Sequence, residues 1–439
     1  MRRAWLAAFL FATPVCWGQS AAPLELTLDK AISLALEQNL DIALAQEQLA
    51  YLEAQRRQAF GLGLPQLALS GLYNRNIIKP KFFLGGQAIT AGQDNSMRQV
   101  ASFQQYLFAG GVVSQGMKAT RLGVAAGQSQ VRAAQEDVVL AVKQLFYAVC
   151  LESATVSIQR DSLSLAEDHL KTVQERYRQG LDSDLTVLRQ EVELANSQPA
   201  LLAALNGHEL SLTLLKDSLG LDVDAPVRVA GNLEGPRVAL APYQALQAEA
   251  LERNPDYQSA RKQLEAAEAM VKVNQGLRWP WLSLYVDGQW YSESNDAWPG
   301  PNERAWSSVA GLRLSYPFYT GGQTSAKIEA ARAQRDQART ALDKIERRIR
   351  VEVKRQWLAV REALQRAQSQ EAAISQARRA LEATEIRYRA GEASLLEQND
   401  VTLALQQTRL LYANALHDYR VALAALERAA GAPAEETAR

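Results

Sequence analysis

Cysteine and histidine are too scarce in this 439-residue chain to build the usual reactive or metal-binding centres. It has two cysteines, Cys16 and Cys150, and three histidines that lie far apart, His169, His208 and His417. This spacing lacks a zinc-ligand pattern, and the sequence has no phosphate-binding glycine loop, HExxH motif or nucleophile elbow. We therefore predict no catalytic residue, no metal and no cofactor, and we expect Cys150 to be a small buried side chain.

An excess of charge of either sign is also missing. The 48 lysines and arginines equal the 48 aspartates and glutamates in number. Such a balanced chain has no strong field to attract a polyanion, so we expect no nucleic-acid partner.

The first twenty residues differ in character from the rest of the chain. They combine a basic start, an apolar stretch and small residues near residue 20, which is typical of a secretory signal peptide. Lipid attachment at Cys16 is a weaker alternative, because Val15 stands where a lipoprotein signal usually has a small residue. Removal of this segment would leave Cys150 without an intrachain disulfide partner.

Long apolar runs are lacking after this leader. No run reaches the roughly 18 residues that a membrane-spanning helix needs. An exported chain of this kind would therefore enter a membrane as β-strands.

The sequence instead contains one long unit twice. The tetrapeptide YRQG ends at Gly180 and YRAG ends at Gly391, an offset of 211 residues that also relates Gly220 to Gly431. Two copies of so long a unit differ from a solenoid, whose repeats are typically ~20–50 residues. The boundaries that we predict are a signal peptide at 1–20, a first repeat at 21–220, a linker at 221–242, a second repeat at 243–431 and a tail at 432–439.

Each repeat contains a long segment without proline, from Gly111 to Gly180 and from Gly322 to Gly391. In the first of these, apolar residues recur at steps of three and four up to Tyr177, the pattern of a packed, coiled-coil-like helix. At 1.5 Å per residue each helix would be on the order of 100 Å long. The glycine at the end of each YRxG tetrapeptide predicts the helix end, so each tetrapeptide marks the tip of a helical hairpin. Pro199 is expected to kink the first return helix.

Four segments ahead of the long helices alternate between apolar and polar residues. They begin near Gln66, Arg98, Trp281 and Trp306. Each is about ten residues long with aromatic residues near its ends, which fits the strands of a membrane β-barrel with a wet lumen. A small soluble sheet is the alternative. Since a membrane barrel needs at least ~8 strands and has no free edge in lipid, four strands would close only when several chains share one barrel.

Together these marks resemble the TolC-type outer-membrane efflux channel family. The resemblance rests on LEQN and LERN near the start of each repeat, Pro65 and Pro280 ahead of the strands, FAGG and YTGG behind them, and the two YRxG tips. It implies an α-dominated fold with membrane strands: a homotrimer whose twelve-stranded outer-membrane barrel continues as a helical tunnel through the periplasm. A mixed equatorial region is expected at residues 221–242 and at the C-terminal tail.

The same resemblance implies a passive conduit in the Gram-negative outer membrane, in contact with its lipid. A periplasmic adaptor would meet the tips, and an inner-membrane pump of the RND, ABC or MFS type would supply energy. A non-conducting coiled-coil scaffold at the surface or in the periplasm is the alternative function. The exported substrate cannot be inferred from these residues.

Family resemblance also assigns roles at the tips. Glu397 and Asp400 stand where the family often has the acidic residues of its periplasmic gate. Asp182 and Asp184 near the first tip are predicted as further gate residues that add negative potential. A solvated helix face is the alternative for all four acids. Three positions apart, Glu397 and Asp400 share a helix face. Ala393 stands where the family often has an arginine that ties the gate shut, so that contact is not expected here.

Small residues at the tips are the expected docking positions for the adaptor. They are Gly180, Leu181, Ser183, Gly391 and Ser394. Turn geometry accounts for the two glycines equally well, so a purely structural role is the alternative.

Overall fold

The computed structural model describes residues 24–79, 81–236 and 240–431. The predicted signal peptide and C-terminal tail lie outside the described residues, as does part of the predicted linker. The first half of the chain contains short strands and long helices: β1 (Leu24–Leu26), α1 (Leu28–Gln38), α2 (Leu40–Gly61), β2 (Gln66–Arg75), β3 (Lys81–Leu84), β4 (Gln87–Thr90), β5 (Asn95–Ala109), α3 (Val112–Arg178), α4 (Asp184–Ser218) and β6 (Val227–Val229).

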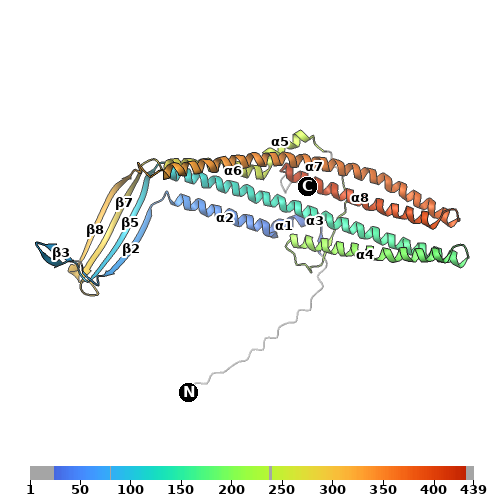
Figure 1. The fold of residues 1–439 in the computed structure, drawn as a ribbon, viewed down its shortest axis with the longest axis horizontal. Helices are drawn as coiled ribbons and strands as arrows, with labels where there is room; N and C mark the ends of the chain where they lie inside the picture. Colours follow the sequence, from blue (N-terminus) through green and yellow to red (C-terminus); the bar gives the residue numbers. More distant parts are fainter. Residues whose placement is uncertain (1–23, 80, 237–239, 432–439) are drawn as a thin grey trace, which may run out of the picture. The chain divides into compact units, whose positions relative to one another are not determined.

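The second half repeats the order of two helices, two long strands, a long helix and a shorter helix. Its elements are α5 (Tyr243–Arg253), α6 (Pro255–Gly276), β7 (Trp281–Ser294), the 3-10 turn η1 (Pro301–Glu303), β8 (Arg304–Ser315), α7 (Gln323–Arg389) and α8 (Leu395–Ala430). Figure 1 shows both halves. α3 and α7 have 67 residues each, in agreement with the two proline-free segments.

Glycines in the left-handed region mark corresponding turns in the two halves. Gly180 and Gly391, at the two hairpin tips, have φ of +76° and +80°, and Gly220 and Gly431 have φ of +70° and +74°. A side chain strains this backbone conformation. The expectation that glycine ends these helices is confirmed.

The described chain divides into two compact units. The first comprises the described parts of residues 1–39, 139–238 and 359–424, and the second those of 40–138, 239–358 and 425–439. The hairpin tips belong to the first unit and the membrane-type strands to the second, and each is described by itself below.

In the second unit the long strands form one antiparallel sheet in the order β2-β5-β7-β8. Cross-strand partners on one face are mostly apolar: Leu67 lies opposite Phe103, Phe103 opposite Val286 and Val286 opposite Ala310. Leu67 and Leu69 are 80% and 81% exposed. Such a row of uncovered leucines requires an apolar surrounding.

The other face of this sheet is largely polar. Ser102 lies between Ala68 and Asp287 in the register, and Gln104 between Gln66 and Tyr285. Arg98 and Arg313 add charge on this face, each stacked over a tyrosine ring of β7 at 5.7 and 4.7 Å. The predicted alternation is therefore confirmed across all four strands.

Three details of the strands differ from the expectation. β5 and β7 have 15 and 14 residues rather than about ten, because they pair on both sides. β8 begins at Arg304, two residues ahead of the expected start near Trp306. β3 and β4, which the sequence pattern did not predict, form a separate two-stranded hairpin.

Helix α3 also corrects an expectation. By length and composition it contains a stretch apolar enough to cross a membrane, 39% of which is buried within the described chain. The prediction rested on unbroken apolar runs, whereas this stretch of α3 contains a few polar residues. A single such helix is weak evidence for a span, since packed core helices meet the same criterion.

In the first unit the long helices pack through apolar residues seven positions apart. Val142 and Val149 are 0% and 1% exposed on α3, and Val360 and Ala367 are 0% and 1% exposed on α7. Seven-residue spacing is the pattern of knobs-into-holes packing. Tyr177, placed in this seam by its spacing, is 46% exposed instead, whereas its counterpart Tyr388 is 3% exposed. Pro199 lies inside α4, which continues through it.

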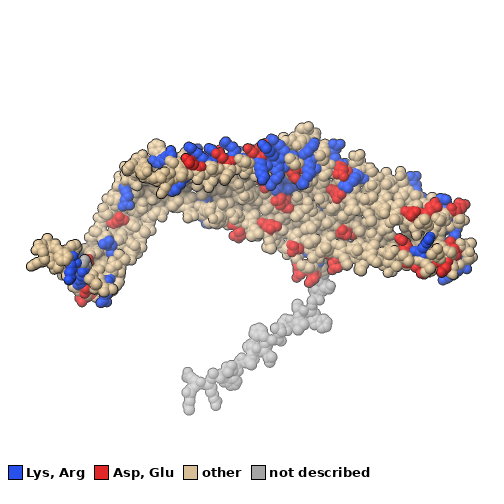
Figure 2. Space-filling view, viewed as in Figure 1, with Lys and Arg blue, Asp and Glu red and all other residues tan. Residues whose placement is uncertain are grey.

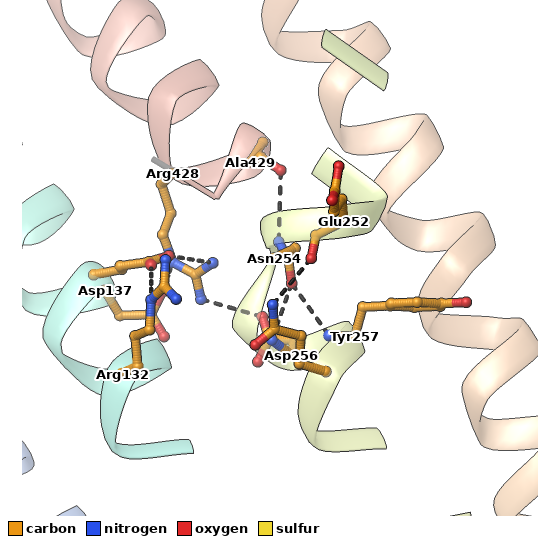
Figure 3. Close-up of polar contacts among 10 residues, drawn as sticks. Arg132, Asp137, Glu252, Asn254, Asp256, Tyr257, Arg428 and Ala429 are labelled. Atoms are coloured by element: carbon orange, nitrogen blue, oxygen red, sulfur yellow. Dashed lines mark hydrogen bonds and ion pairs between the residues drawn. The ribbon is translucent and has the colours of Figure 1, made fainter. Parts of the chain in front are cut away.

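A partly buried charge cluster joins three elements of the second unit (Figure 3). Arg428 of α8 contacts Asp137 of α3 at 2.7 Å, Asp256 of α6 at 3.1 Å and Glu136 of α3 at 3.4 Å. Arg132 contacts Glu136 at 3.2 Å. Burial raises the pKa of Glu136 to about 7, against the opposing effect of the two arginines.

The start of α6 is fixed beside this cluster. Asn254 caps α6 by accepting hydrogen bonds from the amides of Asp256 and Tyr257. Its side chain also donates to the Ala429 carbonyl at 3.5 Å, so the end of α8 is held to the start of α6 (Figure 3).

Candidate functional site

The tip of the first hairpin is a tight turn built from backbone hydrogen bonds. Gly180 and Leu181 donate to the carbonyls of Tyr177 and Arg176, both at 2.9 Å. Ser183 then caps α4, because its hydroxyl accepts a hydrogen bond from the Thr186 amide at 3.3 Å. Ser183 thus has a structural role that its small size did not predict.

The tip of the second hairpin repeats this construction. The amides of Gly391 and Glu392 donate to the carbonyls of Tyr388 and Arg387 at 3.0 and 2.8 Å. Ser394 accepts from the Glu397 amide at 3.2 Å, in the position that Ser183 has in the first tip. The two repeats therefore close their tips in the same way.

A carboxylate of the first tip joins the two hairpins. Asp182 Oδ2 accepts hydrogen bonds from Tyr388 Oη and Arg176 Nε, each at 3.0 Å. The Arg176 guanidinium lies 4.9 Å from the centre of the Tyr388 ring and donates to the Arg389 carbonyl at 3.3 Å. Asp182, predicted as a gate residue that adds negative potential, also forms an ion-paired cross-link between Arg176 of α3 and Tyr388 of α7.

Tyr388 is held as a hydrogen-bond donor. Burial, together with the hydrogen bond to Asp182, raises the pKa of this phenol to about 12. The hydroxyl therefore keeps its proton throughout the physiological range. The YRAG pattern that contains Tyr388 did not predict this contact, which joins residues 206 positions apart.

The other acidic residues at the tips are more exposed. Glu397 forms an ion pair with Arg387 of the same hairpin at 3.0 Å, and these side chains are 44% and 50% exposed. Such an exposed pair stabilises a fold by about 0–1 kcal/mol. Asp184 and Asp400 are exposed. Figure 2 shows acidic side chains gathered over this end of the helices among fewer basic ones.

A buried polar layer lies next to the tips, and sequence reasoning missed it as well. His169 of α3 and Gln398 of α8 are in contact at 2.9 Å between their Nε2 atoms, and Glu385 of α7 lies 3.9 Å from the same imidazole nitrogen. Burial lowers the pKa of His169 against the opposing effect of Glu385. Asn399, next to Gln398, donates to Gln190 of α4 at 3.4 Å. All four long helices of the first unit contribute to this layer.

Further polar contacts hold α3 against α8. Arg409 contacts Asp161 at 2.8 Å, and Gln406 donates to Gln159 at 2.9 Å. These contacts and the layer around His169 place the predicted gate segment of α8 directly beside α3.

The predicted docking residues form open surface. An added Cβ at Gly180 or Gly391 would meet no atom within 4 Å. Leu181 is 61% exposed, and both serines are exposed. The tips therefore have room for a partner, and the φ values alone account for the glycines.

Comparison with known proteins identifies the family. Residues 31–221 and 246–432 match the family model described as outer membrane efflux protein. The chain is 24% identical over 316 residues to the outer membrane efflux protein BepC of Brucella suis, covering 71% of this chain and 68% of that protein. It is 23% identical over 307 residues to the alkaline protease secretion protein AprF of Pseudomonas aeruginosa, covering 68% of this chain and 62% of that protein.

A solved structure shows the same fold. The outer membrane protein VceC of Vibrio cholerae superposes with a TM-score of 0.78 at 19% identity, over 92% of this chain and 96% of that one. The two matched segments of the family model fall on the two halves of this chain. The chain belongs to the outer membrane efflux protein family and is therefore a non-enzymatic channel component of the Gram-negative outer membrane, of the kind that works in tripartite efflux and secretion systems.

Proposed function

We propose that three copies of this chain form one channel with a shared twelve-stranded barrel. The observation that carries this proposal is the open sheet: its outer strands, β2 and β8, each pair on one side only. Lipid offers no hydrogen-bond partner to a free strand edge. Three sheets of four strands reach the minimum of about eight that a membrane barrel needs, with β2 of one copy beside β8 of the next.

The two faces of the sheet support this arrangement. The apolar face, which includes Leu67, Leu69 and Leu312, would meet lipid, and these residues are 64–81% exposed in the single chain. The polar face, with Ser102, Gln104 and Asp287, would line the lumen. A scaffold without a channel has no use for a sheet with these two faces.

We further propose that the helical tips form the periplasmic entrance and that Asp182 keeps it closed. Its hydrogen bond from Tyr388 ties the hairpin that carries the acidic gate segment to the other hairpin, and its ion-pair partner Arg176 donates across to the Arg389 carbonyl. Three copies would gather Glu397 and Asp400 into a ring of six carboxylates. Close like charges in such a ring would favour a bound cation.

Adaptor and pump are the proposed partners. The adaptor would dock at the exposed tip residues Gly180, Leu181, Ser183, Gly391 and Ser394, and an inner-membrane pump of the RND, ABC or MFS type would supply energy. One relative is named for efflux and another for protease secretion, so the same fold serves different cargoes. We propose that the pump, rather than this chain, selects the cargo.

Native mass spectrometry of the detergent-purified protein tests the shared barrel. We expect the mass of three chains, and single cysteines scanned along β2 and β8 should form disulfides between copies. A folded monomer, or disulfides that never join β2 to β8, would contradict the proposal.

A further inference from the structure

An apolar hairpin projects from the loop between β2 and β5, at the end of the sheet away from the helices (Figure 1). Within the described residues, β3 and β4 pair only with each other. Gly85 and Gly86 form the turn, with φ of +58° and +85°, as the tightest hairpin loops require. An isolated two-stranded hairpin is marginally stable in water, so this one needs a partner.

The register divides the hairpin into two faces. Phe82 lies opposite Ile89 and Leu84 opposite Gln87 on one face, whereas Lys81 lies opposite Thr90 and Phe83 opposite Ala88 on the other. The face with Phe82, Leu84 and Ile89 is defined here as the apolar face. These three side chains are 63%, 73% and 51% exposed.

The base of the hairpin is fixed to the neighbouring loop. The Asn295 amide oxygen accepts from Lys79 Nζ at 2.9 Å and from the Asp94 amide at 3.2 Å, and Lys79 pairs with Asp94 at 2.9 Å. The Asn76 amide donates to the Asp94 carbonyl at 2.7 Å. An anchored base with uncovered apolar strands indicates a surface built to contact something.

Exposed apolar side chains also lie in the segments next to the hairpin. Ile77 and Ile78, between β2 and β3, are 93% and 87% exposed, and Trp298 of the neighbouring loop is 78% exposed. Figure 2 shows an uncharged protrusion at this end of the sheet with basic side chains beside it. Tryptophan and basic residues beside an apolar surface are typical of the membrane interface.

We propose that this hairpin lies on the outer leaflet of the membrane with its apolar face against lipid, as an anchor outside the barrel. This rests on the proposed membrane sheet, whose lipid-facing row ends where the hairpin begins. A second copy is the less suitable occupant, because the sheet edges that join copies end at Arg75, before the hairpin. Lys81, the one charged residue of the hairpin strands, then faces the headgroups.

Site-directed fluorescence in proteoliposomes tests the anchor. Cys150 is replaced by serine, and single cysteines are introduced as Ile89→Cys on the apolar face and Ala88→Cys on the opposite face. The labelled proteins are placed in vesicles of phosphatidylcholine and phosphatidylglycerol with either a lipid-attached nitroxide or aqueous iodide as quencher. We expect the nitroxide to remove most of the emission at position 89 and iodide to act mainly at position 88.

A third position separates failure of the anchor from failure of the barrel. Leu69→Cys, on the lipid-facing row of β2, should be quenched by the nitroxide. If position 69 is quenched in this way while iodide quenches both 88 and 89, the hairpin lies in water and the anchor is wrong. If the nitroxide does not quench position 69, the proposed membrane sheet and the proposed anchor are both wrong. Disulfide-linked copies of a Phe82→Cys variant would overturn the anchor in favour of a second copy.

Discussion

At the residue scale, one carboxylate links the two tips. Asp182 is 14% exposed and accepts from Tyr388 and Arg176. A hydrogen bond to a charged group contributes about 1.5–3 kcal/mol. This exceeds the contribution of the exposed Arg387–Glu397 pair, so the link that involves Tyr388 should dominate closure.

Removing one hydroxyl tests this contact. Tyr388→Phe keeps the ring but loses the hydrogen bond to Asp182, about 2 kcal/mol or roughly a 30-fold shift toward the open tip. Hydrogen exchange at the Gly391 and Glu392 amides should become faster by about that factor. The matched control is Tyr177→Phe in the other repeat, where the ring is 46% exposed. Equal effects of the two substitutions would contradict the special role of Tyr388.

Glu136 makes the stability of the second unit depend on pH. Its pKa is about 7 in the folded chain against an ordinary value of 4.5. Between these values the folded state binds more protons than the unfolded state, so the contribution of Glu136 to the free energy of unfolding decreases as pH rises. The loss of stability caused by burying ionised Glu136 is absent below about pH 4.5 and complete above about pH 7.

Glu136→Gln should therefore stabilise the protein at pH 8 by up to about 3 kcal/mol and have little effect at pH 4.5. Thermal unfolding at the two pH values measures this difference. Glu193→Gln, at an exposed position of α4, is the control and should show no such dependence. Destabilisation by Glu136→Gln at pH 8 would show that the contacts with Arg132 and Arg428 outweigh the cost of burial.

At the element scale, the turns at both hairpin tips depend on backbone conformation rather than on packing. An added Cβ at Gly391 meets open space, whereas one at Gly110 would overlap the Gly276 carbonyl oxygen. Substitution at Gly391 thus strains φ by about 1–2 kcal/mol whatever the side chain. A larger side chain at Gly391 would add no further strain and would only obstruct the space outside the tip.

This distinction separates docking from structure. Gly391→Ala and Gly391→Trp should lower the unfolding temperature alike, but only Gly391→Trp should abolish adaptor-dependent export. Gly322→Trp, with φ of +83° and equally open space, is the matched control at the other end of α7. Export that survives Gly391→Trp would leave the glycine with a structural role alone.

Sequence pattern was informative for elements with internal periodicity. The proline-free segments, the repeated glycines and the alternating strands predicted α3, α7 and the four-stranded sheet, because each signal recurs within one segment. The link between Asp182 and Tyr388 and the layer around His169 join segments about 200 residues apart, so no local pattern reveals them. The β3–β4 hairpin was missed because its glycines resemble those of an ordinary loop.

At the scale of the whole molecule, the single chain is an incomplete object. Both outer edges of its sheet lack a strand neighbour, and large apolar side chains on one face are uncovered. In an assembly of three copies, β2 of one copy would pair with β8 of the next, and lipid would cover the apolar face. The account therefore predicts a closed conduit whose resistance lies at the helical tips.

Single-channel conductance in planar bilayers tests this central claim most directly. The parent protein should show a small, cation-selective conductance, and both Tyr388→Phe and the double variant Glu397→Ala plus Asp400→Ala should raise it. The first substitution loosens the tips and the second removes the charges around the entrance. No conductance from a verified, folded trimer, or a parent conductance that neither variant changes, would contradict the account.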